Sequence, residues 1–254
     1  MIEKTDAVVL RSMKYRDTSK IARLYTRDFG RISVIAKGAR DAKSKFRSVL
    51  EPMNFVSCVI YKNINRELQL LSQCDVLRSF SHLSEDMEKM YCAMAALELV
   101  DVAAREEERH EDLFELLLHH ITVVDNATNS ALIALYYFEL KLSELLGFRP
   151  ELEECTLCGK IVEEDVEAGK KFSIGHGLVC AQCSQNDEHA LTISAGTLRV
   201  LQRLQKARTV DSIMNIHLVT AHKNELRATL RRHLQNHIEH FRGLKSEEVF
   251  SAIL

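Results

Sequence analysis

The sequence predicts an α+β multidomain protein, in which a five-stranded β-barrel precedes an all-α region with an inserted four-cysteine finger. Hydrophobic residues alternate with a period of two through the first 80 residues, and with a helical period of 3.6 after Ser81. Four cysteines stand in two Cys-x-x-Cys pairs in the second half. With 46% hydrophobic residues and only 2 prolines in 254, the chain can bury a substantial core.

Residues 1–80 are expected to form the first domain. A first strand is predicted to begin with residues 7–10, and strands are predicted at 21–26 and 31–36, with a turn at Asp28-Phe29-Gly30 between them. A second hairpin is predicted from 55–61 and 67–71. A barrel is the economical way to hide the edges of five short strands. The OB-fold is one such barrel, and its open face commonly binds single strands; an SH3-like barrel is the structural alternative.

Residues 81–254 are expected to form a helical domain, interrupted by the cysteine finger at about 150–190. Gly147 and Pro150 mark the end of the third helix, and Ser194 is a candidate cap for a helix at 195–207, followed by a last helix at 221–241. The first three helices show hydrophobic stripes that we assign to the core: Met87, Met90, Tyr91, Met94 and Leu97; Leu113, Leu116, Leu117 and Ile121; Leu132, Leu135, Leu142 and Leu145.

The two cysteine pairs have the spacing of metal knuckles. Cys155 and Cys158 precede Cys180 and Cys183 by 21 intervening residues, which a short hairpin can fill. Four thiolates fit one closed tetrahedral zinc site, and a closed site leaves no position for a substrate. We therefore predict one structural Zn²⁺ per chain. Disulfides are the weaker alternative, since the sequence starts without a signal peptide and intracellular compartments keep thiols reduced.

Charge is distributed unevenly along the chain. Residues 1–80 carry 16 Lys/Arg against 8 Asp/Glu, whereas residues 81–150 carry 5 against 14. A basic block joined to an acidic block indicates different partners for each, and the basic block is a candidate nucleic-acid surface. No apolar run is long enough for a membrane span, so no membrane partner is expected.

The segment between the third and fourth predicted strands concentrates these cations. In an OB-like barrel it lies beside the binding face, where cations neutralise phosphates and Phe46 or Tyr15 can stack on a base. The alternative is a solvated loop with Phe46 in the core. The candidate DNA contacts are Lys37, Arg40, Lys43, Lys45 and Arg47, together with Arg11, Lys14 and Arg16 of the first strand region.

Motifs of catalysis are missing from the sequence. There is no Walker loop, nucleophile elbow or paired-carboxylate motif, so an enzyme is not expected. His233 and His237 share a face of the last helix, but a solvated or packed helix explains them more simply than a metal site.

Several stretches together resemble the RecO family of bacterial recombination mediators. Residues 26–32, 36–40 and 43–44 are similar to its N-terminal barrel, and residues 138–152, running into Cys155 and Cys158, are similar to its helix before the zinc knuckle. Residues 230–234 and 244–246 resemble its last helix. The resemblance implies an N-terminal OB-fold, a helical domain and a zinc finger, with Cys155, Cys158, Cys180 and Cys183 as ligands.

The resemblance also implies a function in DNA repair and homologous recombination. Such a protein is expected to bind single- and double-stranded DNA, to anneal complementary strands, and with RecR to help load RecA onto DNA coated with single-strand-binding protein (SSB). A cytoplasmic, nucleoid-associated location is implied as well. The acidic, hydrophobic tail of SSB would need a cation beside an apolar groove; candidates are Lys141, Arg149, Arg227, Arg231 and Arg232. The alternatives are an RNA-binding module with a zinc ribbon and a protein-interaction adaptor without annealing activity.

Overall fold

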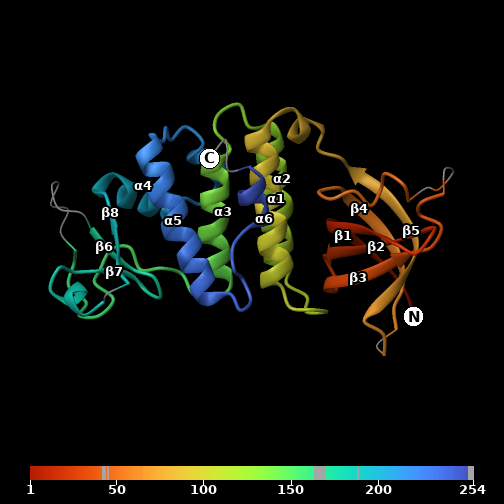
Figure 1. The fold of residues 1–254 in the computed structure, drawn as a ribbon, viewed down its shortest axis with the longest axis horizontal. Helices are drawn as coiled ribbons and strands as arrows, with labels where there is room; N and C mark the ends of the chain where they lie inside the picture. The colour runs from red at the N-terminus through yellow and green to blue at the C-terminus, as the bar shows by residue number, and fades with distance from the viewer. Residues whose placement is uncertain (42–43, 45, 64, 163–169, 188, 251–254) are drawn as a thin grey trace. The chain divides into compact units, whose positions relative to one another are not determined.

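The protein is described from a computed structural model that covers residues 1–41, 44, 46–63, 65–162, 170–187 and 189–250. The chain forms two compact units (Figure 1). Unit 1 comprises residues 1–126 and 244–254, and unit 2 comprises residues 127–243. The domain boundary expected after residue 80 stays a prediction. None of the helices in the described part of the chain is long and apolar enough to cross a bilayer.

Unit 1 contains a closed five-stranded barrel. Its strands are β1 (Ile2–Tyr15), β2 (Ser19–Thr26), β3 (Gly30–Ala36), β4 (Phe55–Tyr61) and β5 (Leu68–Arg78). Their order is β1-β2-β3-β5-β4, and β3 and β5 pair in parallel while the other neighbours are antiparallel. This is the OB-fold arrangement, so the predicted five strands and the OB-fold are confirmed and the SH3-like alternative is discarded.

Strand β1 closes the barrel because it pairs with both β2 and β4. A register shift between Val9 and Arg11 lets this long strand bend around the core. Inward-facing residues alternate along the strands, as in β3, where Ile32, Val34 and Ala36 are buried. Phe46, from the connection between β3 and β4, packs partly buried against this core.

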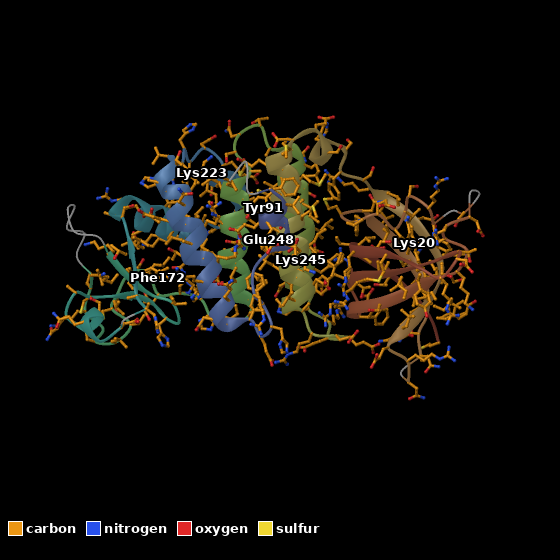
Figure 2. All side chains as sticks on the ribbon, viewed as in Figure 1. Lys20, Tyr91, Phe172, Lys223, Lys245 and Glu248 are labelled. Carbon is orange, nitrogen blue, oxygen red and sulfur yellow. The ribbon has the colours of Figure 1, made fainter. Side chains whose placement is uncertain are left out.

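Unit 1 also contains the helices α1 (Met87–Ala103), α2 (Glu111–Asn126) and α6 (Lys245–Val249), with a short 3-10 turn η1 (Ser81–Glu85) before them. The Asp86 carboxylate caps α1 by accepting from the N–H groups of Glu88 and Lys89. The Glu98 carboxylate of α1 accepts from the N–H groups of Lys245 and Ser246 at 2.7 and 2.9 Å. Tyr91 of α1, labelled in Figure 2, contacts the ring of Phe250, just beyond α6.

The methionine stripe of α1 is a correction to the predicted core. Tyr91 and Leu97 are buried as expected, but Met87 is 58% exposed and Met90 and Met94 are only partly buried. Small side chains line the buried face instead, since Cys92, Ala93, Ala95 and Ala96 have no exposed surface. Alanine and cysteine let neighbouring elements approach closely, so the buried face of α1 combines these small side chains with Tyr91 and Leu97 and leaves the methionines at its edge.

Unit 2 is built on α3 (Leu132–Leu145), α4 (Ala195–Lys206) and α5 (Thr220–His237), with a 3-10 turn η3 (Val210–Ser212) between the last two. Gly147 ends α3 as predicted: it has φ +84°, its N–H donates to Glu144 O, and the N–H of Phe148 donates to Ser143 O. Ser194 caps α4, as predicted, by accepting from the N–H of Thr197. Arg231 of α5 and Glu139 of α3 form a buried ion pair at 2.7 Å.

A small sheet in unit 2 carries the cysteines. It consists of β6 (Lys170–Ser173), β7 (Gly177–Val179) and β8 (Leu191–Ile193), in the order β7-β6-β8, with a 3-10 turn η2 (Cys183–Asn186). β6 and β7 form the hairpin predicted between the two knuckles. Gly177, with φ +123°, lets the chain pass close to Glu151, whose carbonyl oxygen would lie 2.1 Å from an added Cβ.

Candidate metal centre and nucleic-acid surface

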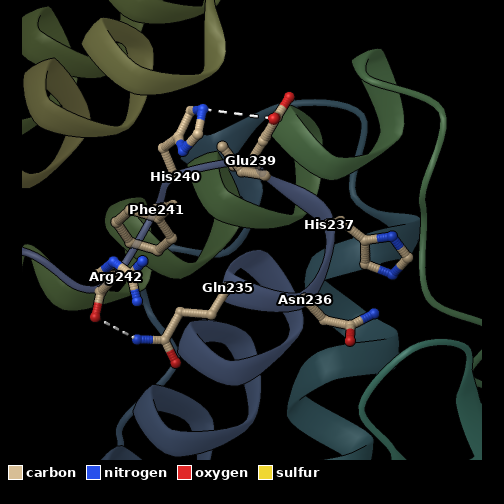
Figure 3. Close-up of a pocket in the computed structure, with 8 residues that line it drawn as sticks. Gln235, Asn236, His237, Glu239, His240, Phe241 and Arg242 are labelled. Carbon is tan, nitrogen blue, oxygen red and sulfur yellow. Dashed lines mark hydrogen bonds and ion pairs between the residues drawn. The ribbon is translucent and has the colours of Figure 1, made fainter.

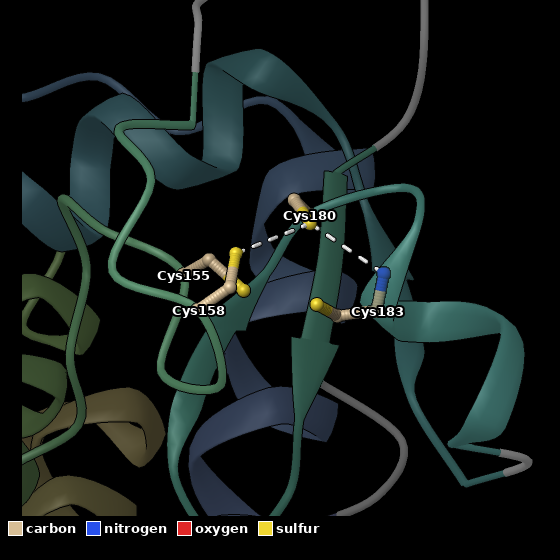
Figure 4. Close-up of side chains that lie close together, drawn as sticks. All are labelled: Cys155, Cys158, Cys180 and Cys183. Carbon is tan, nitrogen blue, oxygen red and sulfur yellow. Dashed lines mark hydrogen bonds between the residues drawn. The ribbon is translucent and has the colours of Figure 1, made fainter.

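The four cysteines of the two knuckles converge in unit 2. The sulfurs of Cys155, Cys158, Cys180 and Cys183 all lie within 4.8 Å of one another, and those of Cys158 and Cys180 are 3.8 Å apart (Figure 4). A tetrahedral Zn²⁺ with Zn–S bonds of about 2.3 Å has sulfur–sulfur edges of about 3.8 Å. The spacing therefore fits a closed four-thiolate metal site.

Each knuckle uses the same backbone turn. The N–H of Gly159 donates to Cys155 O at 2.8 Å, and the N–H of Ser184 donates to Cys180 O at 2.9 Å. In the second knuckle the N–H of Cys183 also points at the Cys180 sulfur, 3.5 Å away (Figure 4). Such N–H groups stabilise a thiolate, which is the form that binds a metal.

The thiol pKa values follow from these contacts. Burial raises the pKa of Cys155, but hydrogen bonds from the backbone of Cys180, Leu157 and Cys158 outweigh it and lower the pKa to about 6. Backbone and side-chain hydrogen bonds from Cys183 lower the pKa of Cys180. Side-chain hydrogen bonds with Cys180 and Cys158 raise the pKa of Cys183 to about 12. In the metal-free cluster, negative charge is therefore favoured on Cys155 and Cys180 and not on Cys183.

Histidines fix the cysteine-bearing sheet to the helices of unit 2. The ring nitrogens of His233 lie 2.8 Å from Ile174 O, in the β6–β7 turn, and from Phe148 O, after α3. His237 stacks on Phe148 with 4.6 Å between ring centroids, and its Nε2 lies 2.9 Å from Gly175 O. His233 is 1% exposed, so the last helix anchors the sheet through buried contacts.

His233 and His237 belong to no group suited to a metal ion among the described residues. At the end of α5, around a pocket lined by residues 235–242, His237 and His240 point to different sides (Figure 3). The four cysteines are the one group suited to a metal ion among the described residues. The packed-helix interpretation of His233 and His237 is thus the one that matches their contacts.

The second candidate site is the barrel surface around the β3–β4 connection. Lys37, Arg40 and Arg47 are exposed there, while Lys43 and Lys45 lie outside the described residues. Arg40 donates to the carbonyl oxygens of Arg16 and Asp17, at 2.8 Å each, so the connection is tied to the β1–β2 turn. Lys14 and Arg16 of that turn region are exposed as well. Five of the predicted DNA contacts thus come from neighbouring segments of one unit.

A pocket of about 400 Å³ opens beside this connection. Lys37, Ser44 and Phe46 line it from the connection, and residues 72–75 line it from β5. Phe46 is therefore partly in the core, as the alternative prediction had it, and also reaches the pocket. The opening therefore holds one cation and one aromatic ring, which suit a phosphate and a base, together with polar groups that include the Asp75 carboxylate.

Other barrel cations turn toward the acidic helices of the same unit. The Asp101 carboxylate of α1 lies 2.9 Å from Arg23 and 3.5 Å from Arg11, and Arg31 donates to Asp101 O. Arg27 pairs with Glu115 of α2. Arg11, a predicted DNA contact, is thus already engaged with a carboxylate. The opposite charges of the two blocks are a sequence signal of this pairing, which sequence reasoning missed.

The cations predicted to bind a protein partner differ in exposure. Lys141 and Arg149 share the Glu144 carboxylate, at 2.8 and 3.7 Å. On α5, Arg232 is exposed and Arg227 is partly buried beside Asn224. Arg231 is a correction to this surface set: it is 6% exposed and paired with Glu139.

Comparison with known protein families identifies the family of this chain. The model of the recombination protein O N-terminal domain matches residues 1–80, and that of its C-terminal domain matches residues 84–248. The chain belongs to the RecO family. The resemblance seen in the sequence is confirmed, and the RecO family is one of DNA repair and recombination proteins.

Individual relatives match along the whole chain. The protein named DNA repair protein RecO from Symbiobacterium thermophilum is 33% identical over 251 residues, which cover 98% of this chain and 96% of the relative. Its namesake from Exiguobacterium sibiricum is 31% identical over 257 residues, covering 100% and 98%. That of Chloroherpeton thalassium is 29% identical over 259 residues, covering both chains fully.

Proposed function

We propose that this RecO-family protein binds DNA through its barrel and anneals complementary strands, without catalysing a chemical step. The observation that carries the proposal is the group of exposed cations, Lys37, Arg40 and Arg47, beside a pocket lined by Phe46 on an OB-fold barrel. Cations near phosphates release counterions, which supplies affinity independent of sequence. Phe46 offers a stacking surface that accepts any base.

Annealing follows from the same electrostatics. Two complementary strands repel each other, and a cationic barrel surface that screens one strand lets the second approach. The contacts fall mainly on phosphates, so they fix position and carry little sequence information. The proposed substrates are therefore single- and double-stranded DNA of any sequence.

Handling of protein-coated strands requires a further contact. We assign it to the helical part of the chain, where Lys141 and Arg149, or Arg227 and Arg232, would pair with the acidic tail of SSB. RecR is the proposed partner through which the protein helps load RecA. These assignments rest on the family and on the exposed or shared cations of unit 2.

The four cysteines are proposed to hold one structural zinc ion. The sulfur spacing and the lowered pKa values of Cys155 and Cys180 support a thiolate-bound cation. A bound zinc ion would crosslink the two knuckles, and no step of annealing is assigned to it. The knuckles, β6 and β7 would then fold around the ion.

Annealing of complementary oligonucleotides, bare and SSB-coated, tests this function. Wild-type protein should accelerate both reactions. Lys37→Ala with Arg47→Ala should slow both, whereas Arg105→Ala should not, because Arg105 is an exposed cation in the acidic part of unit 1. Strands coated with SSB that lacks its acidic tail should anneal more slowly than strands coated with wild-type SSB. Absence of annealing together with tight RNA binding would favour the RNA-binding alternative.

A further inference from the structure

Two cysteines of the barrel lie outside the metal site and face each other. Cys58 of β4 and Cys74 of β5 are directly opposite in the antiparallel pair, and their sulfurs are 3.0 Å apart. Cys58 is 0% exposed and Cys74 is 4% exposed. Both are free thiols, and one donates its hydrogen to the other.

The strand pairing already provides the backbone geometry of a disulfide. Directly opposite residues of antiparallel strands have Cα atoms about 4.5–5.5 Å apart. Disulfides form over Cα separations of about 4.4–6.8 Å, with a sulfur–sulfur bond of about 2.05 Å. Closing the remaining gap between the two sulfurs needs side-chain rotation and no change in strand register.

The two thiols differ in access. Cys74 lines the pocket of about 400 Å³ beside Lys37 and Phe46, whereas Cys58 lies behind it in the barrel core. A small oxidant that enters the pocket therefore reaches Cys74 first. The hydrogen bond with Cys74 and burial raise the pKa of the Cys58 thiol, which lowers the reactivity of Cys58 toward an oxidant.

We propose that Cys58 and Cys74 are a site of reversible oxidative modification, at which hydrogen peroxide converts the thiol pair into a cross-strand disulfide. In the first step the Cys74 sulfur attacks peroxide: an S–O bond forms, the O–O bond breaks and water leaves, giving a sulfenic acid. The Cys58 sulfur then attacks the Cys74 sulfur. The S–S bond forms, the S–O bond breaks, and the departing hydroxide takes the Cys58 proton as water.

Two thiols and one peroxide thus give one disulfide and two waters. The bond would join β4 to β5 covalently and would withdraw the Cys74 sulfur from the wall of the pocket. This site is separate from the four metal-site cysteines, which lie in unit 2. The proposal does not depend on the assignment of DNA to the barrel.

Peptide mapping of the zinc-loaded full chain tests the proposed disulfide. Trypsin places Cys58 in the peptide 48–62 and Cys74 in the peptide 67–78, and each peptide contains no other cysteine. After treatment with a small excess of peroxide, these two peptides should appear linked, with two hydrogens lost. Dithiothreitol should separate them again. Glutathione disulfide, which is far larger than peroxide, should give far less of the linked product.

Variants separate the two chemical steps. Cys58→Ala should leave a Cys74 sulfenic acid that dimedone captures, and Cys92→Ala, at a buried cysteine of α1, should leave the linked product unchanged. If Cys58→Ala does not fold, the peptide map of the wild-type protein tests the proposal by itself. The proposal is overturned if peroxide oxidises the metal-site cysteines while both barrel peptides keep free thiols, or if Cys74 is overoxidised without linkage.

Discussion

At the scale of single residues, Gly30 shows how one position joins two segments of unit 1. It has φ +63°, and an added Cβ would lie 2.0 Å from Glu108 O. The N–H of Glu107 donates to Arg31 O, so the segment before α2 lies directly on the start of β3. A side chain at this glycine would have to push that backbone away.

Gly30→Ala should therefore lower the free energy of unfolding by more than backbone strain alone, which is about 1–3 kcal/mol. Gly38→Ala is the matched control, because Gly38 has φ +67° in the same unit and would meet only the flexible Asp41 carboxylate, at 3.2 Å. Denaturant unfolding of both variants measures the difference. Equal losses of stability would show that the contact with Glu108 is unimportant.

His233 gives unit 2 a dependence on pH. Burial lowers its pKa, although hydrogen bonds to Ile174 O and Phe148 O oppose this; His237 and His176 also lower it. A histidine whose folded pKa lies below the unfolded value of about 6.5 is protonated first in the unfolded chain. Stability should consequently fall as the pH drops below about 6.5, and His233→Gln should flatten this part of the profile. Identical slopes for the two proteins would refute the assignment.

At the scale of elements, the five strands and the barrel were predictable, but the order in which the strands pair was not. Apolar runs and alternation, with the turn residues between them, identified all five strands of the barrel, because these patterns depend on neighbours in sequence. The parallel pairing of β3 with β5 joins residues more than 30 positions apart, such as Ser33 and Leu68, and leaves no local signal. Met87 was misassigned for a similar reason: which face of α1 is buried depends on what packs against it.

The ion pairs between the barrel strands and α1 should contribute to stability. Asp101 is partly buried and accepts from Arg23, so Asp101→Asn removes charged hydrogen bonds worth about 1.5–3 kcal/mol. Glu51→Gln, at a more exposed partner of Lys20, should cost less than about 1 kcal/mol. Chemical denaturation compares the two. A larger loss for Glu51→Gln would contradict the role given to Asp101.

The cysteine-bearing sheet should depend on its metal more than the barrel does. Elemental analysis should find one zinc per chain. Chelation or Cys155→Ser should speed hydrogen exchange in residues 170–187 and leave β1–β5 protected, because the sheet has three short strands and the barrel has its own core. Cys92→Ser controls for loss of a buried thiol. Unchanged exchange in the metal-free protein would argue against a structural role.

At the scale of the whole molecule, the site was only partly visible in the sequence. Cysteine spacing alone identified the metal cluster, since two knuckles bring four sulfurs together whatever lies between them. The cations of the barrel were identified as a block, but the sequence could not separate Lys37 and Arg47, which are exposed, from Arg23, which pairs with Asp101. That separation depends on which side of a strand faces α1.

The salt dependence of oligonucleotide binding tests most directly the claim that the exposed barrel cations hold DNA. Affinity should fall linearly with the logarithm of salt concentration, and Lys37→Ala and Arg47→Ala should each reduce the slope by about one, equally for unrelated sequences. Arg23→Ala, at an internally paired cation, should leave the slope unchanged. Wild-type affinity and slope in the Lys37→Ala, Arg47→Ala double variant would contradict the account.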